Sequence, residues 1–255
     1  MPRFIDLSAP ITASPAELPE PLRTDLTIQD HADGAAQIRA LTGVGPELLR
    51  DGEGWATETF TNFSTHGTTH VDAPWHYNSR IGGERAQTID ELPLAWFHGP
   101  GVKLDFTRKA DGDAITSAEV DVALDAAGHD LQPGDIVLMH TGRDAFYDDP
   151  GYMALGCGVT QEATLALHAR GVRVMGIDAW GWDAPLHLQA EQAKAEEASG
   201  IFWAAHQAGV TYCQIERLCN LDALPPTGFT VSCFPLRVVG GSAGPTRAVA
   251  IVEGD

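Results

Sequence analysis

Three histidines and an aspartate lie within the eleven residues from His66 to His76, which read HGTTHVDAPWH. No other stretch of the sequence concentrates so many metal-binding side chains. Neutral imidazole and carboxylate together suit zinc, manganese or iron, and a site with only three protein ligands leaves positions open for water and substrate. The segment therefore predicts a catalytic metal site. The alternative is that these are surface histidines that bind nothing.

The spacing of His70 and Asp72 favours an extended chain rather than a helix. Residues two apart project from the same side of a strand, so both side chains would face one site. Gly67 and the two threonines after it are weak helix formers. A bend near Gly67 would bring His66 in beside the other two, which gives two nitrogens and one carboxylate oxygen.

His76 follows Pro74, and that proline constrains the loop on which His76 is expected to lie. At this position the histidine is either a fourth ligand or a nearby proton carrier. An imidazole titrates near neutral pH and therefore suits the second role.

Composition limits the partners of this chain. Its 255 residues include 16 Lys and Arg against 35 Asp and Glu, for a formal net charge of -19. Such a balance argues against nucleic acid and anionic membranes and leaves a small-molecule substrate as the expected partner. The N-terminus does not look like a signal peptide, and no stretch has the roughly 20 apolar residues of a membrane span. We therefore expect a cytoplasmic protein with reduced cysteines.

The order of elements predicts one α/β domain over residues 1–255 with a mixed sheet. A buried strand, a helix and a second buried strand follow one another at 135–140, 160–170 and 172–177, which is typical of an α/β unit. Further strands are expected at 4–8, 55–64, 101–106, 229–236 and 247–252, and further helices at 117–127, with Ser117 as its cap, and at 186–199. Residues 12–54 are expected to be irregular, except around 35–41.

Aromatic side chains are the candidates for contact with the substrate. Trp180 and Trp182 follow the strand at 172–177, where they either line a site for a flat apolar molecule or pack as ordinary core residues. Trp75, inside the histidine segment, is the third candidate. His206 and Glu216 lie on either side of Tyr212 in the sequence, and both could join a metal centre. Taken alone, each is better explained as a structural residue, with His206 at the end of a solvent-facing helix and Glu216 capping a turn.

These motifs resemble the cyclase family of metal-dependent hydrolases, which includes bacterial kynurenine formamidase and isatin hydrolase. The resemblance spans nearly the whole chain and is most specific in the histidine segment. It also rests on residues 5–8, 134–138, 141–142, 176–178, 215–221, 235–236 and 244–250.

The resemblance implies a swivelling β/β/α fold, usually as a homodimer or homotetramer. It assigns His66, His70 and Asp72 as ligands of the first metal and His76 as the catalytic acid/base. The cofactor would be Zn²⁺ or Mn²⁺, with one or two ions per chain.

For a second metal, the resemblance implies that Asp72 bridges and that Glu216 and His206 complete the site. Glu216 matches through its Leu-x-Asn-Leu context. His206 lies ten residues before Glu216, whereas the formamidases separate the corresponding residues by twelve, so a shorter loop is required here.

The expected reaction is hydrolysis of an amide by water that a metal activates, because a bound divalent ion lowers the pKa of water from 15.7 to about 7. An aryl formamide, a cyclic amide and a cyclic imide are the expected substrates. A lactone or ester hydrolase using the same site is the main alternative, and a non-catalytic metal-binding protein is another. Nothing in the residues points to the carbon–carbon cyclisation that the family name suggests.

Overall fold

The computed structural model describes residues 1–15, 18 and 20–254. The chain divides into two compact units. The sheet unit comprises Met1–Ala9 and Thr68–Asp255, and the hairpin unit comprises Pro10–Gly67. The single domain expected from the sequence stays a prediction.

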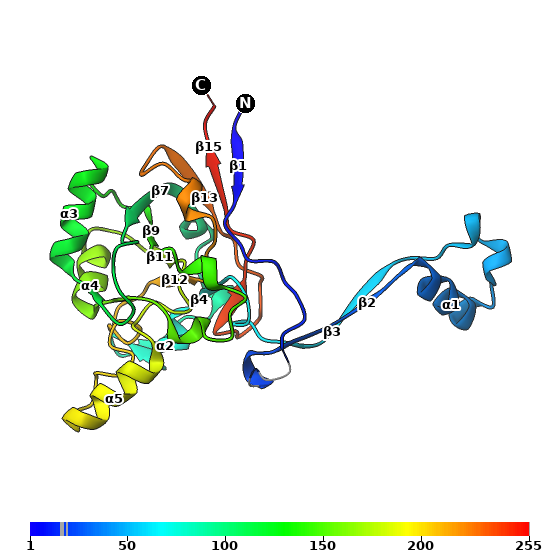
Figure 1. The fold of residues 1–255 in the computed structure, drawn as a ribbon, viewed down its shortest axis with the longest axis horizontal. Coiled ribbons are helices and arrows are strands. Elements are labelled where there is room, and N and C mark those ends of the chain that lie inside the picture. The colour runs from blue at the N-terminus through cyan, green and yellow to red at the C-terminus, as the bar shows by residue number, and fades with distance from the viewer. Residues whose placement is uncertain (16–17, 19, 255) are drawn as a thin grey trace. The chain divides into compact units, whose positions relative to one another are not determined.

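A nine-stranded mixed sheet organises the sheet unit (Figure 1). Its order is β1 (Arg3–Asp6), β15 (Val249–Val252), β13 (Phe229–Ser232), β7 (His98–Asp105), β9 (Ile136–His140), β11 (Val174–Ile177), β12 (Cys213–Glu216), β4 (His70–Asp72) and β14 (Ala243–Pro245). Strands β7, β9, β11 and β12 are parallel, and the strands that flank them are antiparallel. This arrangement confirms the α/β class with a mixed sheet.

Apolar side chains pack on both faces of the sheet, which explains why the central strands β9 and β11 read as continuous apolar runs. On one face, helices α3 (Ser117–Ala127) and α4 (Gln161–Ala169) pack over β7, β9 and β11 (Figure 1). The core on the other face contains alternate residues of the same strands, such as Ile136 and Leu138 of β9.

Helix termini follow from local hydrogen bonding. Helix α4, which the sequence predicts at 160–170, begins after Thr160, whose hydroxyl accepts from the backbone N–H of Ala163. Helix α3 is capped by Thr116 rather than by Ser117. Thr116 and Glu119 form a reciprocal capping box, and this arrangement satisfies two backbone N–H groups that Ser117 would leave open.

The remaining α-helices and strands of the sheet unit are α2 (Pro74–Tyr77), α5 (Leu186–Glu196), the pair β5 (Arg80–Ile81) and β6 (Glu84–Arg85), and the pair β8 (Ala114–Ile115) and β10 (Gly158–Val159). Within the described residues, no helix combines the length and the apolar character that crossing a membrane requires.

The hairpin unit is more regular than the sequence predicts. Strands β2 (Thr24–Gln29) and β3 (Thr57–Phe63) pair antiparallel, and α1 (His31–Thr42) lies between them in the chain. The expectation of irregular structure over 12–54 was therefore wrong for β2 and for the part of α1 outside 35–41. Residues 16, 17 and 19 of that range lie outside the described residues. The sequence of α1 shows little helical spacing of apolar residues, because the helix buries only Gly34 and Ala35.

Candidate metal centre

Strand register brings the central side chains together. Strand β12 pairs antiparallel with β4 so that Glu216 lies opposite His70. Side chains alternate along a strand, so His70, Asp72 and Glu216 all project from the same face of the sheet. Val71 and Ile215, which lie between them in the two strands, enter the apolar core on the other face. The extended geometry predicted for His70 and Asp72 is confirmed.

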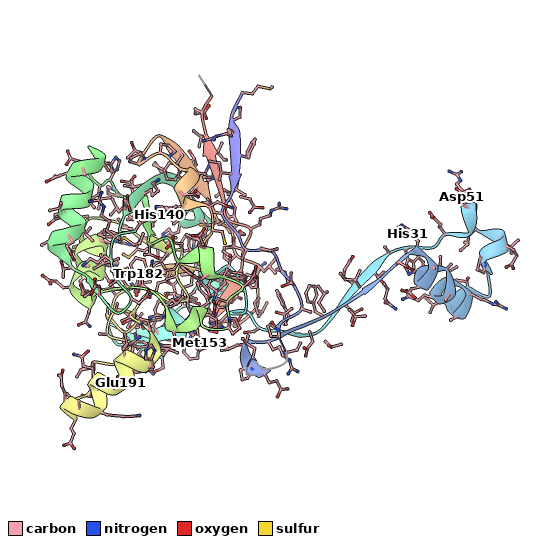
Figure 2. The ribbon with its side chains drawn as sticks, in the orientation of Figure 1. His31, Asp51, His140, Met153, Trp182 and Glu191 are labelled. Carbon is pink, nitrogen blue, oxygen red and sulfur yellow. The ribbon has the colours of Figure 1, made fainter. Side chains whose placement is uncertain are left out.

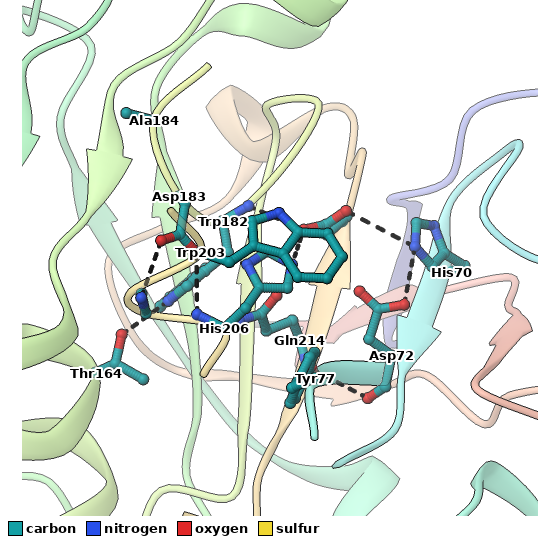
Figure 3. A network of polar contacts seen from close by, with 12 residues as sticks. His70, Asp72, Tyr77, Thr164, Trp182, Asp183, Ala184, Trp203, His206 and Gln214 are labelled. Carbon is teal, nitrogen blue, oxygen red and sulfur yellow. Dashed lines mark hydrogen bonds and ion pairs between the residues drawn. The ribbon is translucent and has the colours of Figure 1, made fainter. Parts of the chain in front are cut away.

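The three side chains form a compact buried cluster (Figure 3). His70 Nε2 lies 3.1 Å from Asp72 Oδ1 and 3.8 Å from Glu216 Oε2. One ligand atom from each of the three residues lies within 4.8 Å of the others. His70 Nδ1 is 2.7 Å from the carbonyl oxygen of Thr68, a contact that places the proton on Nδ1 and directs Nε2 toward the carboxylates.

Negative charge dominates this cluster. Burial by itself lowers the pKa of His70, but the charge and hydrogen bond of Asp72, followed by the charge of Glu216, raise that pKa above its usual value. Two carboxylates removed from water need a compensating cation. A divalent ion would supply that compensation.

His206 lies on the other side of Glu216. Its Nε2 atom is 3.4 Å from Glu216 Oε1, and its Nδ1 is 2.5 Å from Asp183 Oδ2. The Asp183 carboxylate also accepts from the backbone N–H groups of Ala205 and His206. Burial acts to lower the pKa of His206, but hydrogen bonds to Asp183 and Glu216 outweigh burial and raise it to about 10. His206 is thus buried at the cluster rather than at the end of an exposed helix.

His76 lies in α2, a single helical turn rather than the loop expected from the sequence. Tyr77 anchors this turn, because its hydroxyl accepts from the backbone N–H of Gln214 and donates to the carbonyl oxygen of Asp72. A ring nitrogen of His76 lies within 4.8 Å of a carboxylate oxygen of Asp72. The turn therefore holds His76 at the edge of the cluster.

His66 belongs to the hairpin unit, where its Nδ1 is 3.1 Å from the hydroxyl of Thr65. Its assignment as a metal ligand stays a prediction from the sequence.

The three tryptophans proposed to contact the substrate lie in different environments. Trp182 is fully buried in the core (Figure 2), and its indole N–H donates to Thr164 Oγ1 at 2.9 Å. Its ring has no exposed surface to offer a substrate, so we do not retain it as a substrate-binding residue. Its backbone N–H instead donates to Glu216 Oε1 at 2.9 Å. Trp75 is 38% exposed, and Trp180 is half-buried.

Two residues of the site have roles that were not predicted from the sequence, although Asp183 was among the candidates for lining a pocket. Trp203 stacks on His206 with ring centroids 4.7 Å apart and lies 5.2 Å from the ring of His76 (Figure 3). Asp183 orients His206 by the hydrogen bond described above. Neither has a local signal, since each takes its role from contacts with residues distant in the sequence.

The donor set fits a divalent transition metal. Imidazole nitrogen and carboxylate oxygen are ligands of zinc, manganese and iron, and the cluster supplies both kinds in buried positions. His206 carries a carboxylate partner on its second ring nitrogen, which is the usual arrangement for a histidine that binds a metal.

Comparison with known proteins gives the family. The family profile described as "Putative cyclase" matches residues 5–184. The chain belongs to the cyclase family. It is an enzyme of that family, a hydrolase. The match includes the whole histidine segment, and it ends before His206 and Glu216.

Relatives and solved structures agree with this membership. The chain is 30% identical over 186 residues to the kynurenine formamidase of Salinibacter ruber, covering 73% of this chain and 76% of the relative. It is 27% identical over 200 residues to the isatin hydrolase of Roseibium aggregatum, covering 73% of this chain and 72% of that relative. The structure of isatin hydrolase A from Ralstonia solanacearum superposes with a TM-score of 0.73 at 23% identity, covering 99% of this chain and 92% of that one. This likeness confirms the fold class.

Proposed function

We propose that the enzyme hydrolyses the amide C–N bond of an aryl formamide or of a cyclic amide or imide. The observation that carries the proposal is the buried cluster of His70, Asp72 and Glu216 with His76 at its edge. Similarity to a kynurenine formamidase and to an isatin hydrolase supports an amide as the bond cleaved.

The ligands would divide between two positions. His66, His70 and Asp72 would hold the first ion, Zn²⁺ or Mn²⁺. Only three residues separate His66 from His70, so chain length keeps their Cα atoms within about 14 Å. If a second ion binds, Asp72 would bridge and Glu216 and His206 would complete its site. A bound divalent ion supplies a water of lowered pKa and polarises the carbonyl group.

The remaining steps belong to side chains of the protein. His76 would accept the proton of the attacking water and return it to the leaving nitrogen, as a general base and then a general acid. The ring of Trp203 next to His76 offers a flat apolar surface for an aryl group. Trp75 and Trp180 remain candidates for further contact with the substrate.

A substrate panel tests the reaction. Initial rates with N-formylkynurenine, isatin and a lactone of matched size would be measured on metal-loaded enzyme, with and without chelator. The proposal predicts chelator-sensitive turnover of at least one of the two amides, at a rate above that of the lactone. Faster cleavage of the lactone would favour the ester-hydrolase alternative. A bound metal with no turnover of any acyl compound would favour a binding protein.

Assembly and location are proposals from the resemblance and the sequence. We propose a homodimer or homotetramer in the cytoplasm, acting on a small molecule without nucleic acid or membrane partners. Light scattering coupled to size-exclusion chromatography measures the assembly, and a monomer at micromolar concentration would contradict it.

A further inference from the structure

Arg217 is a buried cation that the reaction described above does not use. It follows Glu216 directly and is only 4% exposed. Among the residues that the structure describes, its Nε atom has no hydrogen-bond partner. A guanidinium group keeps its charge even though burial lowers the pKa of Arg217. The negative charges of Glu216 and Asp72 act on this group, but they leave its buried Nε–H without an acceptor, so a ligand anion that accepts this hydrogen bond is a reason for the group to be there.

The backbone at Arg217 supports a role for its side chain. Its φ is 60°, in the left-handed region that glycine and asparagine adopt more readily than arginine. The conformation is fixed from both sides. Its N–H donates to the carbonyl oxygen of Ala179 at 3.1 Å, and its carbonyl oxygen accepts from the hydroxyl of Thr69 at 2.6 Å. Arginine therefore occupies a position where its backbone preferences are poorly met.

The surroundings orient the guanidinium plane. Its central carbon lies 3.6 Å from the centroid of the Trp180 ring, so one face of the plane is covered by an aromatic ring. Trp180 in turn lies edge to face with Tyr152 at 6.1 Å. Because Trp180 covers one face of the guanidinium plane, a ligand would bind at the N–H edge of Arg217. This edge has the geometry that binds a carboxylate by two parallel hydrogen bonds.

Arg217 also lies close to the metal centre. It is the chain neighbour of Glu216, and its carbonyl oxygen accepts from Thr69, the residue directly before His70. On the basis of the function proposed above, we propose that Arg217 binds a carboxylate group of the ligand, carried by the amide substrate or generated by its hydrolysis. Trp180 holds the guanidinium in place for this contact. The substrate class is then an aryl amide that bears, or yields, a carboxylate on its aromatic part.

Matched substrates test this role. Rates would be measured with 2-formamidobenzoate and with formanilide, which lacks the carboxylate, on the metal-loaded full chain. The variants are Arg217→Asn, whose new residue suits the left-handed backbone, and Arg217→Lys, which keeps the charge. Arg170→Asn is the control, because it removes one exposed positive charge outside the site.

We expect Arg217→Asn to lower kcat/KM for 2-formamidobenzoate by about 30-fold or more and to change kcat/KM for formanilide far less. Arg217→Lys should restore part of the loss. The melting temperature of Arg217→Asn should stay equal or rise, because a strained arginine is removed. An equal loss on both substrates, or a loss explained by unfolding, would overturn the proposal.

A binding measurement separates this inference from the reaction. Calorimetric titration with benzoate and with neutral benzamide would be made on the same metal-loaded variants. Weaker binding of benzoate to Arg217→Asn, with no change for benzamide, supports the carboxylate site. If this is found but neither 2-formamidobenzoate nor formanilide is hydrolysed, the carboxylate site stands and only the proposed reaction fails. If benzoate binding depends on Arg217 but kcat/KM is unchanged for both substrates in Arg217→Asn, the carboxylate that Arg217 binds is that of the product. Benzoate binding that is equal in wild type and Arg217→Asn would contradict the proposal.

Discussion

Glu216 and His70 are paired across strands β12 and β4, and this pairing sets Glu216 Oε2 3.8 Å from His70 Nε2. The two residues are far apart in the sequence, so the register of the sheet assembles the metal centre. A shift of β12 by one residue would send the Glu216 side chain to the opposite, apolar face. The centre is therefore held by the same hydrogen bonds that hold the sheet.

Asp183 is expected to support metal binding through His206. The Asp183→Asn substitution weakens the contact that orients the imidazole of His206. We therefore expect the affinity for one metal ion to fall by about 10- to 100-fold. Competition with a fluorescent chelator measures this affinity. Asp121→Asn, which removes a carboxylate paired with Arg170 at the surface, is the matched control. Equal affinity in wild type and Asp183→Asn would mean that His206 is not a ligand.

Much of the fold follows from local sequence, whereas the outer part of the site does not. The continuous apolar runs of β9 and β11 identify buried strands, and the two-residue spacing of His70 and Asp72 identifies an extended segment. Strand β12 was not predicted, although its four residues CQIE alternate apolar and polar side chains, because four residues are the shortest run in which such alternation indicates a strand. The pairing of Asp183 with His206 depends on how two loops meet, which no local pattern encodes.

The burial of Trp182 is another feature that local sequence could not predict. A tryptophan after a strand is as consistent with a substrate site as with the core. Its position is decided by Thr164, which supplies the buried acceptor that the indole N–H needs.

Replacement of His76 tests its role in proton transfer. His76→Ala should retain metal and fold and lower kcat by about 10²- to 10⁴-fold, the usual contribution of a general acid/base. Metal content and kcat would be measured together, with the exposed His187→Ala as control. A loss of metal equal to that of His70→Ala would instead make His76 a ligand.

The cysteine thiols are expected to be unreactive in the native protein. Burial raises the pKa of Cys157 to about 11 and that of Cys233 to about 12. Each thiol is therefore almost fully protonated at pH 8, and its alkylation rate should rise about tenfold per pH unit below the pKa. Iodoacetamide at pH 8 should leave activity intact, and all 4 cysteines should react after unfolding in urea. Rapid alkylation of one native thiol with loss of activity would point to a cysteine nucleophile.

The hydrogen bond between Thr164 and Trp182 should contribute measurably to stability. Thr164→Val keeps the side-chain volume but leaves the buried indole N–H without its acceptor. We expect the free energy of unfolding to fall by about 1–3 kcal/mol. Urea titration measures the change, with the exposed Thr59→Val as control. A change no larger than that of the control would show that the indole finds another partner.

The central claim is that the cluster of His70, Asp72 and Glu216 is part of a centre that binds one or two catalytic metal ions. The most direct test is metal content per chain by elemental analysis of metal-loaded protein, for wild type and for Asp72→Ala. We predict one or two Zn²⁺ or Mn²⁺ ions per wild-type chain and none in the folded variant, since Asp72 is placed to contact both positions. Wild-type protein that binds no metal after loading, or a variant with normal metal content, would contradict the account.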